Sequence, residues 1–384
     1  MTRRGFAGRA PADRLARVIE LPNRRRFLAA SAGALALPAC TAGPRPVVTA
    51  SPPPACLPRV QADRSRVIRT VAGLRPFRAS GFVVRREPLG DKALVHNYGH
   101  GGAGITLSWG TSRLATDLGL PGHSGPVAVI GAGIMGLTTA RLVQEAGFPV
   151  TIYTAALPPD TTSNIAGGQW SPYGHFDRGA VTPQWREQFA KAREYSWRRF
   201  QIMVGEDYGV RWIPTYTLGR APDPGDPPDP YQPAGRRLAR SEHPFPNEVV
   251  GRYDTMYVEA GRFLRELTKD VQIAGGRIAV RRFATPAELA ALSETLIFNC
   301  TGLGSHALFG DTELVPIRGQ MAILLPQPEI RYAFTGDGYM FPRPDGILLG
   351  GTFERGEWNA EPQAADLDRI IAEHQRMAAG WRCA

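Results

Sequence analysis

The sequence predicts an α/β fold, in which a Rossmann-like dinucleotide-binding domain is combined with a second domain of mixed-sheet α+β structure. A chain of 384 residues with 43% apolar residues is long enough to bury the cores of two such domains. A Gly-x-Gly-x-x-Gly motif stands between a short apolar strand and a helix. Strand and helix patterns then alternate toward the end of the chain, as α/β proteins require.

The residues around the glycine motif predict a complete β-α-β unit. Val127–Ile130 and Val150–Tyr153 are apolar strands, and the residues between them have helical spacing. Gly131 permits a tight turn, Gly133 lets backbone amides approach a pyrophosphate, and Gly136 lets the helix pack on the strand. The partial positive charge of the helix N-terminus favours phosphate at the same place. The sequence therefore predicts a dinucleotide site.

The second strand of this unit lacks the acidic residue that usually binds a ribose. It ends in Tyr153 and Thr154, so we expect Thr154 or the backbone to take that part. Nothing at this position favours NADP over FAD or NAD.

The remaining elements are expected from periodicity and turn residues. They are a helix at 105–118, a long amphipathic helix at 183–204, a Pro-rich surface loop at 219–235, a helix at 263–271, a strand at 277–283, a helix opened by a capping box at 285–288, a buried strand at 296–300, a strand-rich stretch at 314–353 and a closing helix at 367–379.

The basic character of the chain is concentrated near its N-terminus. Residues 1–39 hold eight arginines against Asp13 and Glu20, which leaves +4 of the net +10 for the rest of the chain. No later basic run is interleaved with aromatic residues, so a nucleic-acid partner is not expected. Arg24 and Arg25 precede a short apolar run, a pattern that resembles a twin-arginine export signal.

Leu37-Pro38-Ala39-Cys40 follows that run and resembles a lipobox, which implies a lipid anchor at Cys40. The alternative is a basic, Ala-rich tail. We expect an exported protein, anchored on the outer face of the cytoplasmic membrane or in the cell envelope. The four cysteines show no C-x-x-C spacing, so no metal site is expected; Cys56 and Cys383 could pair in an oxidising compartment, although the spacing does not require it.

Seven blocks of sequence are informative in combination. They are VAVIGAGIMGLTTARLVQEAGFPVTIY, PPDTTSNIAGGQWSPY, IFNCTGLGS, PIRGQMAIL, GYMFPRPDGILLGGTFERGEWN, GLRPFR and VHNYGHGGAGITLSWG. Together these blocks, which reach from about Asp63 to Ala379, resemble the D-amino acid oxidase family of FAD-dependent enzymes. In that family the last two blocks lie at the carboxyl end. Here they come first, so the chain resembles a circular permutation of the family, joined through GLPGHSGP.

The resemblance implies a division of the chain into segments. These are an export signal with lipobox at 1–40, a Pro/Ala-rich linker at 41–62, a permuted C-terminal segment of the family at 63–120, an FAD-binding domain at 127–182 and 250–312, and a substrate domain at 183–249 and 313–384.

The same resemblance implies the site residues. Arg75 matches the family's carboxylate-binding arginine, and its guanidinium can bind both oxygens in a fork. Tyr339 matches a tyrosine that hydrogen-bonds the same carboxylate, whereas Thr335 stands near the place of a second tyrosine found in some members. Arg318 is interpreted as a structural or cofactor-side charge. The expected FAD contacts are Gly131, Gly133, Gly136, Thr161, Thr162, Ala166, Gly167, Gly101, Gly102, Gly104, Ile105 and Thr106, with Trp170 in the same loop as Gly167.

The activity that the resemblance implies is oxidative deamination of D-amino acids to 2-oxo acids, ammonia and hydrogen peroxide. The partners would be a small amino acid and oxygen or another electron acceptor, and positioning of the substrate would replace a side-chain base. One alternative is a flavin oxidase or dehydrogenase of glycine, secondary amines or D-aspartate. Another is a surface lipoprotein that binds a dinucleotide without catalysis.

Overall fold

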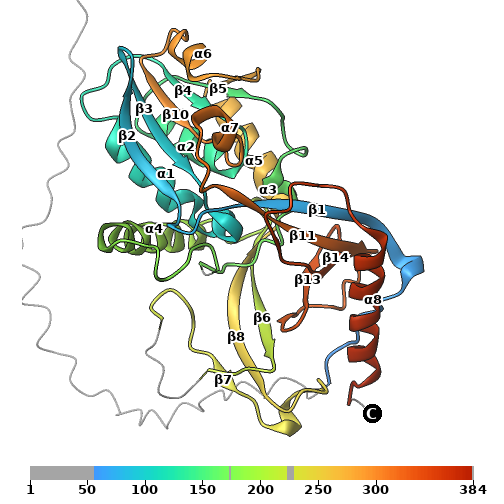
Figure 1. Ribbon diagram of the computed structural model, residues 1–384. Helices are drawn as coiled ribbons and strands as arrows, with labels where there is room; N and C mark the ends of the chain where they lie inside the picture. The colour runs from blue at the N-terminus through green and yellow to red at the C-terminus, as the bar shows by residue number, and fades with distance from the viewer. Residues whose placement is uncertain (1–55, 173, 223–228, 383–384) are drawn as a thin grey trace, which may run out of the picture. The chain divides into compact units, whose positions relative to one another are not determined.

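The computed structural model describes residues 56–172, 174–222 and 229–382 (Figure 1). The predicted export signal with Cys40, residues 41–55 of the linker and Cys383 lie outside this part of the chain. Two β-sheets with their covering helices organise the described residues.

The first sheet has six strands and carries the dinucleotide motif. Its order is β2 (Val83–Leu89), β3 (Lys92–Tyr98), β10 (Leu296–Asn299), β4 (Val127–Ile130), β5 (Val150–Thr154) and β9 (Arg277–Val280). The strands from β3 to β9 pair in parallel, and β2 is antiparallel to β3. All four residues of β4 are buried, as expected for a parallel strand that is covered on both faces.

Helices pack beside this sheet and on one another. They are α1 (Gly104–Gly119), α2 (Ile134–Glu145), α4 (Pro183–Gln201) and α5 (Ala260–Ile273), with the short helices α3 (Thr162–Ile165), α6 (Pro286–Ala290) and α7 (Gly304–Phe309). Of the 3₁₀ turns, η3 (Gly101–Ala103) leads into α1, whereas η2 (Arg64–Arg66) and η4 (Arg240–Glu242) adjoin strands of the other sheet. α1 packs against α2 and α4, and α2 packs against α5. Gly110 lets α1 approach α4 closely, because a Cβ there would lie 1.8 Å from the Ala192 carbonyl oxygen.

The second sheet has nine strands. Its order is β1 (Val67–Phe77), β11 (Val315–Leu324), β14 (Gly346–Gly350), β13 (Tyr339–Arg343), β12 (Ala333–Thr335), β6 (Val210–Leu218), β8 (Val250–Val258) and β7 (Arg236–Arg237), and β15 (Glu354–Arg355) also pairs with β11. Helix α8 (Ala364–Ala379) packs against β11 and β14.

The segment at 63–120 takes part in both sheets. β1 is an outer strand of the nine-stranded sheet, whereas β2 and β3 extend the six-stranded sheet beside β10. In Figure 1 these blue and cyan strands lie beside strands from the other end of the sequence, coloured orange and red. The early segment therefore completes the same fold as the rest of the chain.

Most expected elements are confirmed, with differences in detail: the helix expected at 183–204 ends at Gln201. Strand β9 ends at Val280 rather than Phe283, and the next residues turn toward a cavity. At α6, Thr285 is the N-cap but makes no side-chain capping bond, and Glu288 accepts instead from the Ala284 amide. The expected boundary at residue 250 does not follow the sheets, because β8 pairs with β6 and β7 in the nine-stranded sheet.

Among the described residues, no helix is both long and apolar enough to cross a membrane. Cys56 is disulfide-bonded. Cys300 is a free, buried thiol, and its burial raises its pKa to about 12. The pairing of Cys56 with Cys383 stays a prediction, because Cys383 lies outside the described residues.

Candidate functional site

The glycine motif forms a tight turn between β4 and α2. Gly131 has φ +111°, and a Cβ there would lie 2.6 Å from the Cys300 carbonyl oxygen. Gly136 sits in the first turn of α2, where a Cβ would lie 1.8 Å from the Gly131 carbonyl oxygen. Gly131 therefore makes the turn possible, and Gly136 serves the packing of helix on strand without lining the cavity described below.

Neighbouring side chains brace this turn. The Thr154 hydroxyl accepts a hydrogen bond from the Ala132 amide at 3.1 Å and donates to the Ala156 carbonyl at 2.7 Å. The Ser163 hydroxyl accepts from the Ile134 amide at 3.0 Å. Because its hydroxyl is already engaged in both directions, Thr154 supports the turn and has no proton left to offer a ribose. A second lone pair on the Thr154 oxygen can still accept from a ribose hydroxyl, so the Thr154 alternative for ribose recognition stays a prediction.

A second glycine-rich turn leads from β3 into α1. Gly99 and Gly101 have φ of +85° and +51°, and a Cβ on Gly101 would lie 3.1 Å from the Cα of His175. His100, between them, is buried, and its Nε2 lies 2.9 Å from the Thr111 hydroxyl. Burial, with a smaller contribution from nearby His175, lowers the pKa of His100 to about 3, so its ring is neutral near pH 7. His100 supports the turn as an uncharged group.

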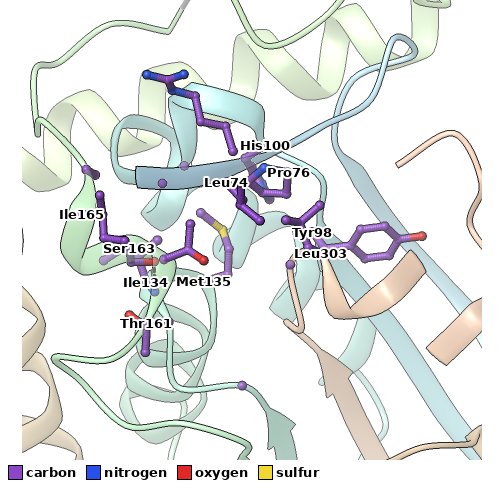
Figure 2. Close-up of a pocket in the computed structure, with 18 of the residues that line it drawn as sticks. Leu74, Pro76, Tyr98, His100, Ile134, Met135, Thr161, Ser163, Ile165 and Leu303 are labelled. Carbon is purple, nitrogen blue, oxygen red and sulfur yellow. Dashed lines mark hydrogen bonds between the residues drawn. The ribbon is translucent and has the colours of Figure 1, made fainter. Parts of the chain in front are cut away.

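The two turns meet. A Cβ on Gly104 would lie 3.8 Å from the Met135 methyl group and 4.0 Å from Ile134 Cγ2. Figure 2 shows side chains of Leu74 and His100, from the early segment, around the same pocket as Ile134 and Met135. Residues that are far apart in the sequence thus form one site.

Arg75 lies on β1, where the backbone of a neighbouring strand makes room for it. Its guanidinium covers Gly319, at which a Cβ would lie 2.3 Å from Arg75 Nη2, and its Cδ lies 3.5 Å from the corresponding position on Gly102. The Arg75 Nη1 atom is buried and has no hydrogen-bond partner in the described part of the chain. A buried cationic donor without a partner indicates that an anionic ligand belongs here.

Tyr339 lies next to Arg75. Its ring covers Gly350 and Gly351, so that a Cβ on Gly351 would lie 2.7 Å from the Tyr339 hydroxyl. Burial raises the pKa of Tyr339, and the charge and hydrogen bond of Arg75 offset only part of that effect. The Tyr339 hydroxyl therefore stays protonated and can donate a hydrogen bond to the ligand that Arg75 attracts.

A cavity of about 880 Å³ connects the two glycine turns with Arg75 and Tyr339. Most of the expected site residues line it: Arg75, Tyr339, Gly131, Gly133, Thr161, Thr162, Ala166, Gly167, Gly101, Gly102, Gly104 and Ile105. An elongated dinucleotide fits this arrangement, because a glycine turn at a helix N-terminus lies toward one end and an unpartnered cationic donor toward the other.

Some expected residues have other roles. The Thr106 hydroxyl accepts from the Ser171 amide at 3.1 Å, so Thr106 fastens the segment at 169–171 and does not line the cavity. Trp170 is buried against Trp197 and Phe200 as a core residue. Arg318 pairs with Glu354 and is 2% exposed, which confirms the structural interpretation.

Other cavity residues were not predicted from the sequence. Arg281, Arg282 and Phe283 follow β9 and line the end near Thr154, while Gln169 and Phe341 line the end near Tyr339. The strand pattern at 277–283 hid the first group, and no sequence signal distinguishes Gln169 from an ordinary loop residue. Among the described residues, no cluster of His, Cys, Asp and Glu could hold a metal ion.

Comparison with known proteins identifies the family. The family model described as "DAO: FAD dependent oxidoreductase" matches residues 54–118 and 126–380. The chain belongs to this family of FAD-dependent oxidoreductases. FAD is therefore the dinucleotide for which the cavity is built.

Individual relatives of this FAD-dependent oxidoreductase are distant. Human D-aspartate oxidase is 30% identical over 259 residues, which cover 64% of this chain and 74% of that protein. The D-amino-acid oxidase of Streptomyces coelicolor is 28% identical over 277 residues, covering 68% of this chain and 81% of that protein. The solved glycine oxidase of Bacillus cereus has 15% identity and a TM-score of 0.47, covering 65% of this chain and 77% of that one.

Proposed function

We propose that this FAD-dependent oxidoreductase catalyses the oxidative deamination of D-amino acids to 2-oxo acids, ammonia and hydrogen peroxide. The observation that carries the proposal is the unpartnered, buried Nη1 of Arg75 beside the protonated Tyr339 hydroxyl, in the cavity that also holds the dinucleotide turn. The names of the D-aspartate and D-amino-acid oxidases among the relatives support the same class of substrate.

The chain's own residues bind and orient the substrate. Arg75 receives the α-carboxylate in a fork, and Tyr339 donates a hydrogen bond to the same group, which fixes Cα in the cavity. Bound FAD would supply a two-electron acceptor for the hydride from Cα, while the amine nitrogen gives up a proton; oxygen would take the two electrons and two protons as peroxide. The imine product is hydrolysed by water. His100, neutral and hydrogen-bonded to Thr111, is not used as a base.

Three finer features belong to the same proposal. The chain is a circular permutation of the family, which is supported by the two matched segments and by the short stretch 119–125 between them. The contact between the Trp381 indole and the Leu57 carbonyl, 3.0 Å long, is what adjacent new termini would produce.

We further propose export by the twin-arginine-like leader and a lipid anchor at Cys40, supported by the sequence pattern alone.

One experiment tests the catalytic proposal directly. The absorbance spectrum of the purified protein is recorded before and after anaerobic addition of mixed D-amino acids, with the L-isomers as control. We expect a flavin spectrum that is bleached by the D-isomers. A colourless protein, or a flavin that stays oxidised with every D-amino acid, would contradict the proposal. Separate additions of glycine, secondary amines and D-aspartate distinguish the alternative substrates.

A further inference from the structure

The nine-stranded sheet presents a row of neutral polar groups beside Tyr339. Thr335 pairs with Tyr339 across β12 and β13, and with Thr217 across β12 and β6. Thr215, two residues before Thr217, pairs with Tyr253 on β8. Directly paired residues share a face of a sheet, so these side chains all lie on the face of Tyr339.

Thr335 brings an unused hydrogen-bonding group to this face. It lines the cavity, and its hydroxyl oxygen is buried without a hydrogen-bond partner among the residues described. A hydroxyl in that position both donates and accepts when a ligand supplies the complementary group. An apolar group placed against it would leave it unsatisfied.

Gln169 lies above the same face with its amide fixed. Its Nε2 donates to the Tyr253 hydroxyl at 3.0 Å, and its backbone carbonyl lies 3.4 Å from the Thr106 hydroxyl. The next residue, Trp170, donates its amide to the Met256 carbonyl at 2.8 Å. Gln169 also lines the cavity, so a held carboxamide meets the ligand there. Thr335 lies on β12, and Gln169 is bonded to Tyr253 on β8. Strands β12 and β8 lie on either side of β6, about 10 Å from each other, so Thr335 and Gln169 border one short subsite.

The cavity-lining residues at this subsite offer no cation to a second carboxylate. Of the described residues that line the cavity, only Arg75, Arg281 and Arg282 carry a permanent positive charge. Arg281 and Arg282 follow β9, which lies in the other sheet, and the Arg281 amide donates to the Thr154 carbonyl at the dinucleotide end. Arg75 is reserved for the α-carboxylate, so a side-chain carboxylate would find no cation among the lining residues, and Arg220, whose charge acts on Tyr253, is exposed to solvent.

From these contacts we propose that Gln169 and Thr335 select D-amino acids with a neutral, hydrogen-bonding side chain, a carboxamide foremost. This inference rests on the proposed function, because it assigns the side-chain subsite of the same reaction. A carboxamide supplies one donor group and one acceptor, which match the Gln169 amide and the Thr335 hydroxyl. A site that is built to hydrogen-bond its substrate rejects an analogue that lacks the bonding group.

Unreactive analogues test the selection without turnover. Succinamate, succinate and 4-methylpentanoate are asparagine, aspartate and leucine with hydrogen in place of the amino group, and they differ only at the end of the side chain. Their dissociation constants are measured from the flavin absorbance change of the holoenzyme. We expect succinamate to bind at least roughly tenfold more tightly than the other two, since each of them leaves polar groups unmatched. Equal or tighter binding of succinate or 4-methylpentanoate overturns the inference.

Matched variants identify the residues responsible. Gln169→Leu is expected to remove most of the preference for succinamate over 4-methylpentanoate, and Thr335→Val to remove part of it. The controls are Gln201→Leu, at an exposed position at the end of α4, and Thr312→Val, at an exposed loop position. Unchanged preferences in both Gln169→Leu and Thr335→Val overturn the assignment. The flavin spectrum of each variant shows whether it has folded and bound FAD.

Turnover separates the two proposals. Flavin reduction is followed with D-asparagine, D-aspartate and D-leucine, and D-asparagine is expected to give the highest kcat/KM. If D-leucine or D-aspartate reduces the flavin at least as well as D-asparagine, the subsite assignment fails while the proposed function stands. If none of a full panel of D-amino acids reduces the flavin, the proposed function fails and the inference with it.

Discussion

At the scale of single residues, the site depends on groups that the protein leaves unpaired. The Arg75 guanidinium rests on Gly319, and its Nη1 has no hydrogen-bond partner in the described chain. By contrast, Arg318, one residue earlier than Gly319, is paired with Glu354 and lies outside the cavity. Arg318 is buried and paired with a carboxylate, whereas Arg75 is half-buried and keeps its Nη1 without a partner among the described residues.

Arg75→Ala tests this assignment. Removing one partner of a buried charge pair costs about 2–5 kcal/mol of binding, so we expect kcat/KM for the preferred D-amino acid to fall by roughly 30-fold to several thousand-fold. Arg69→Ala is the matched control, because Arg69 lies on the same strand and its side chain is 55% exposed. Steady-state kinetics with both variants decide the matter, and an Arg75→Ala enzyme with the kinetics of the unmodified protein would refute the assignment.

Buried histidines make the fold sensitive to acid. Burial lowers the pKa of both His100 and His175 to about 3, and both rings stack with Phe82. Below pH 6.5 these histidines bind protons in the unfolded chain but stay neutral in the folded chain, so the free energy of unfolding falls as the pH falls. From pH 7.5 to pH 5, each histidine is expected to lower the free energy of unfolding by about 2 kcal/mol.

His175→Phe isolates one of these contributions. Phe176, Trp185 and Phe189 surround His175, so a phenyl ring is accommodated while the titration is removed. Over the same pH range, we expect the free energy of unfolding of the variant to fall by about 2 kcal/mol less than that of the unmodified protein. Denaturant unfolding at pH 7.5 and pH 5 measures the difference, and parallel losses in the two proteins would show that His175 does not titrate on unfolding.

At the scale of elements, glycines set the distances between helices, strands and turns. Gly136 brings α2 against the turn at Gly131, Gly110 brings α1 against α4, and Gly101 brings the second turn against His175. These contacts fix where the amides of both turns can meet a ligand. Local backbone contacts thus determine the shape of the cavity.

Gly110→Ala is expected to be strongly destabilising. The new Cβ would lie 1.8 Å from a backbone oxygen of α4, and relief requires the two helices to separate. Overpacking of this kind costs about 1–3 kcal/mol or more, so we expect the Tm to fall by several degrees. Gly261→Ala on α5 is the control, since a Cβ there meets open space and alanine favours the helix. A Gly110→Ala protein with the same Tm as the unmodified protein would contradict the close approach of α1 to α4.

The sequence predicts such elements well and their cross-strand contacts poorly. The β-α-β unit and the helix after the second glycine turn are confirmed, because each has a local signature. Arg75 lines the cavity, but only the family resemblance singled it out. Thr106 and Gln169 could not be assigned in this way. Their roles depend on hydrogen bonds to Ser171 and Tyr253, residues 65 and 84 positions away, and sequence periodicity does not specify such partners.

At the scale of the whole molecule, one cavity is assembled from two segments that enter the fold from opposite ends of the chain. β1 and β3 lie beside β11 and β10, the Gly102 and Gly104 turn reaches Arg75 and Met135, and Trp381 contacts Leu57. These contacts depend on position in space and not on the order of synthesis. The order of the segments should therefore be dispensable once the fold has formed.

A reordered chain tests this directly. In this variant, residues 126–382 come first and are joined by a short Gly/Ser linker to residues 56–118, with the stretch 119–125 removed. Because the Trp381 indole lies 3.0 Å from the Leu57 carbonyl, a linker of a few residues spans the new junction. We expect the reordered protein to bind FAD with the same stoichiometry as the natural protein. Its kcat/KM for the preferred substrate should lie within roughly threefold of the natural value, because both glycine turns and Arg75 keep their neighbours. Flavin content after gel filtration and steady-state kinetics measure the outcome. A soluble but flavin-free reordered protein would show that the natural order of the segments is itself required to build the cavity.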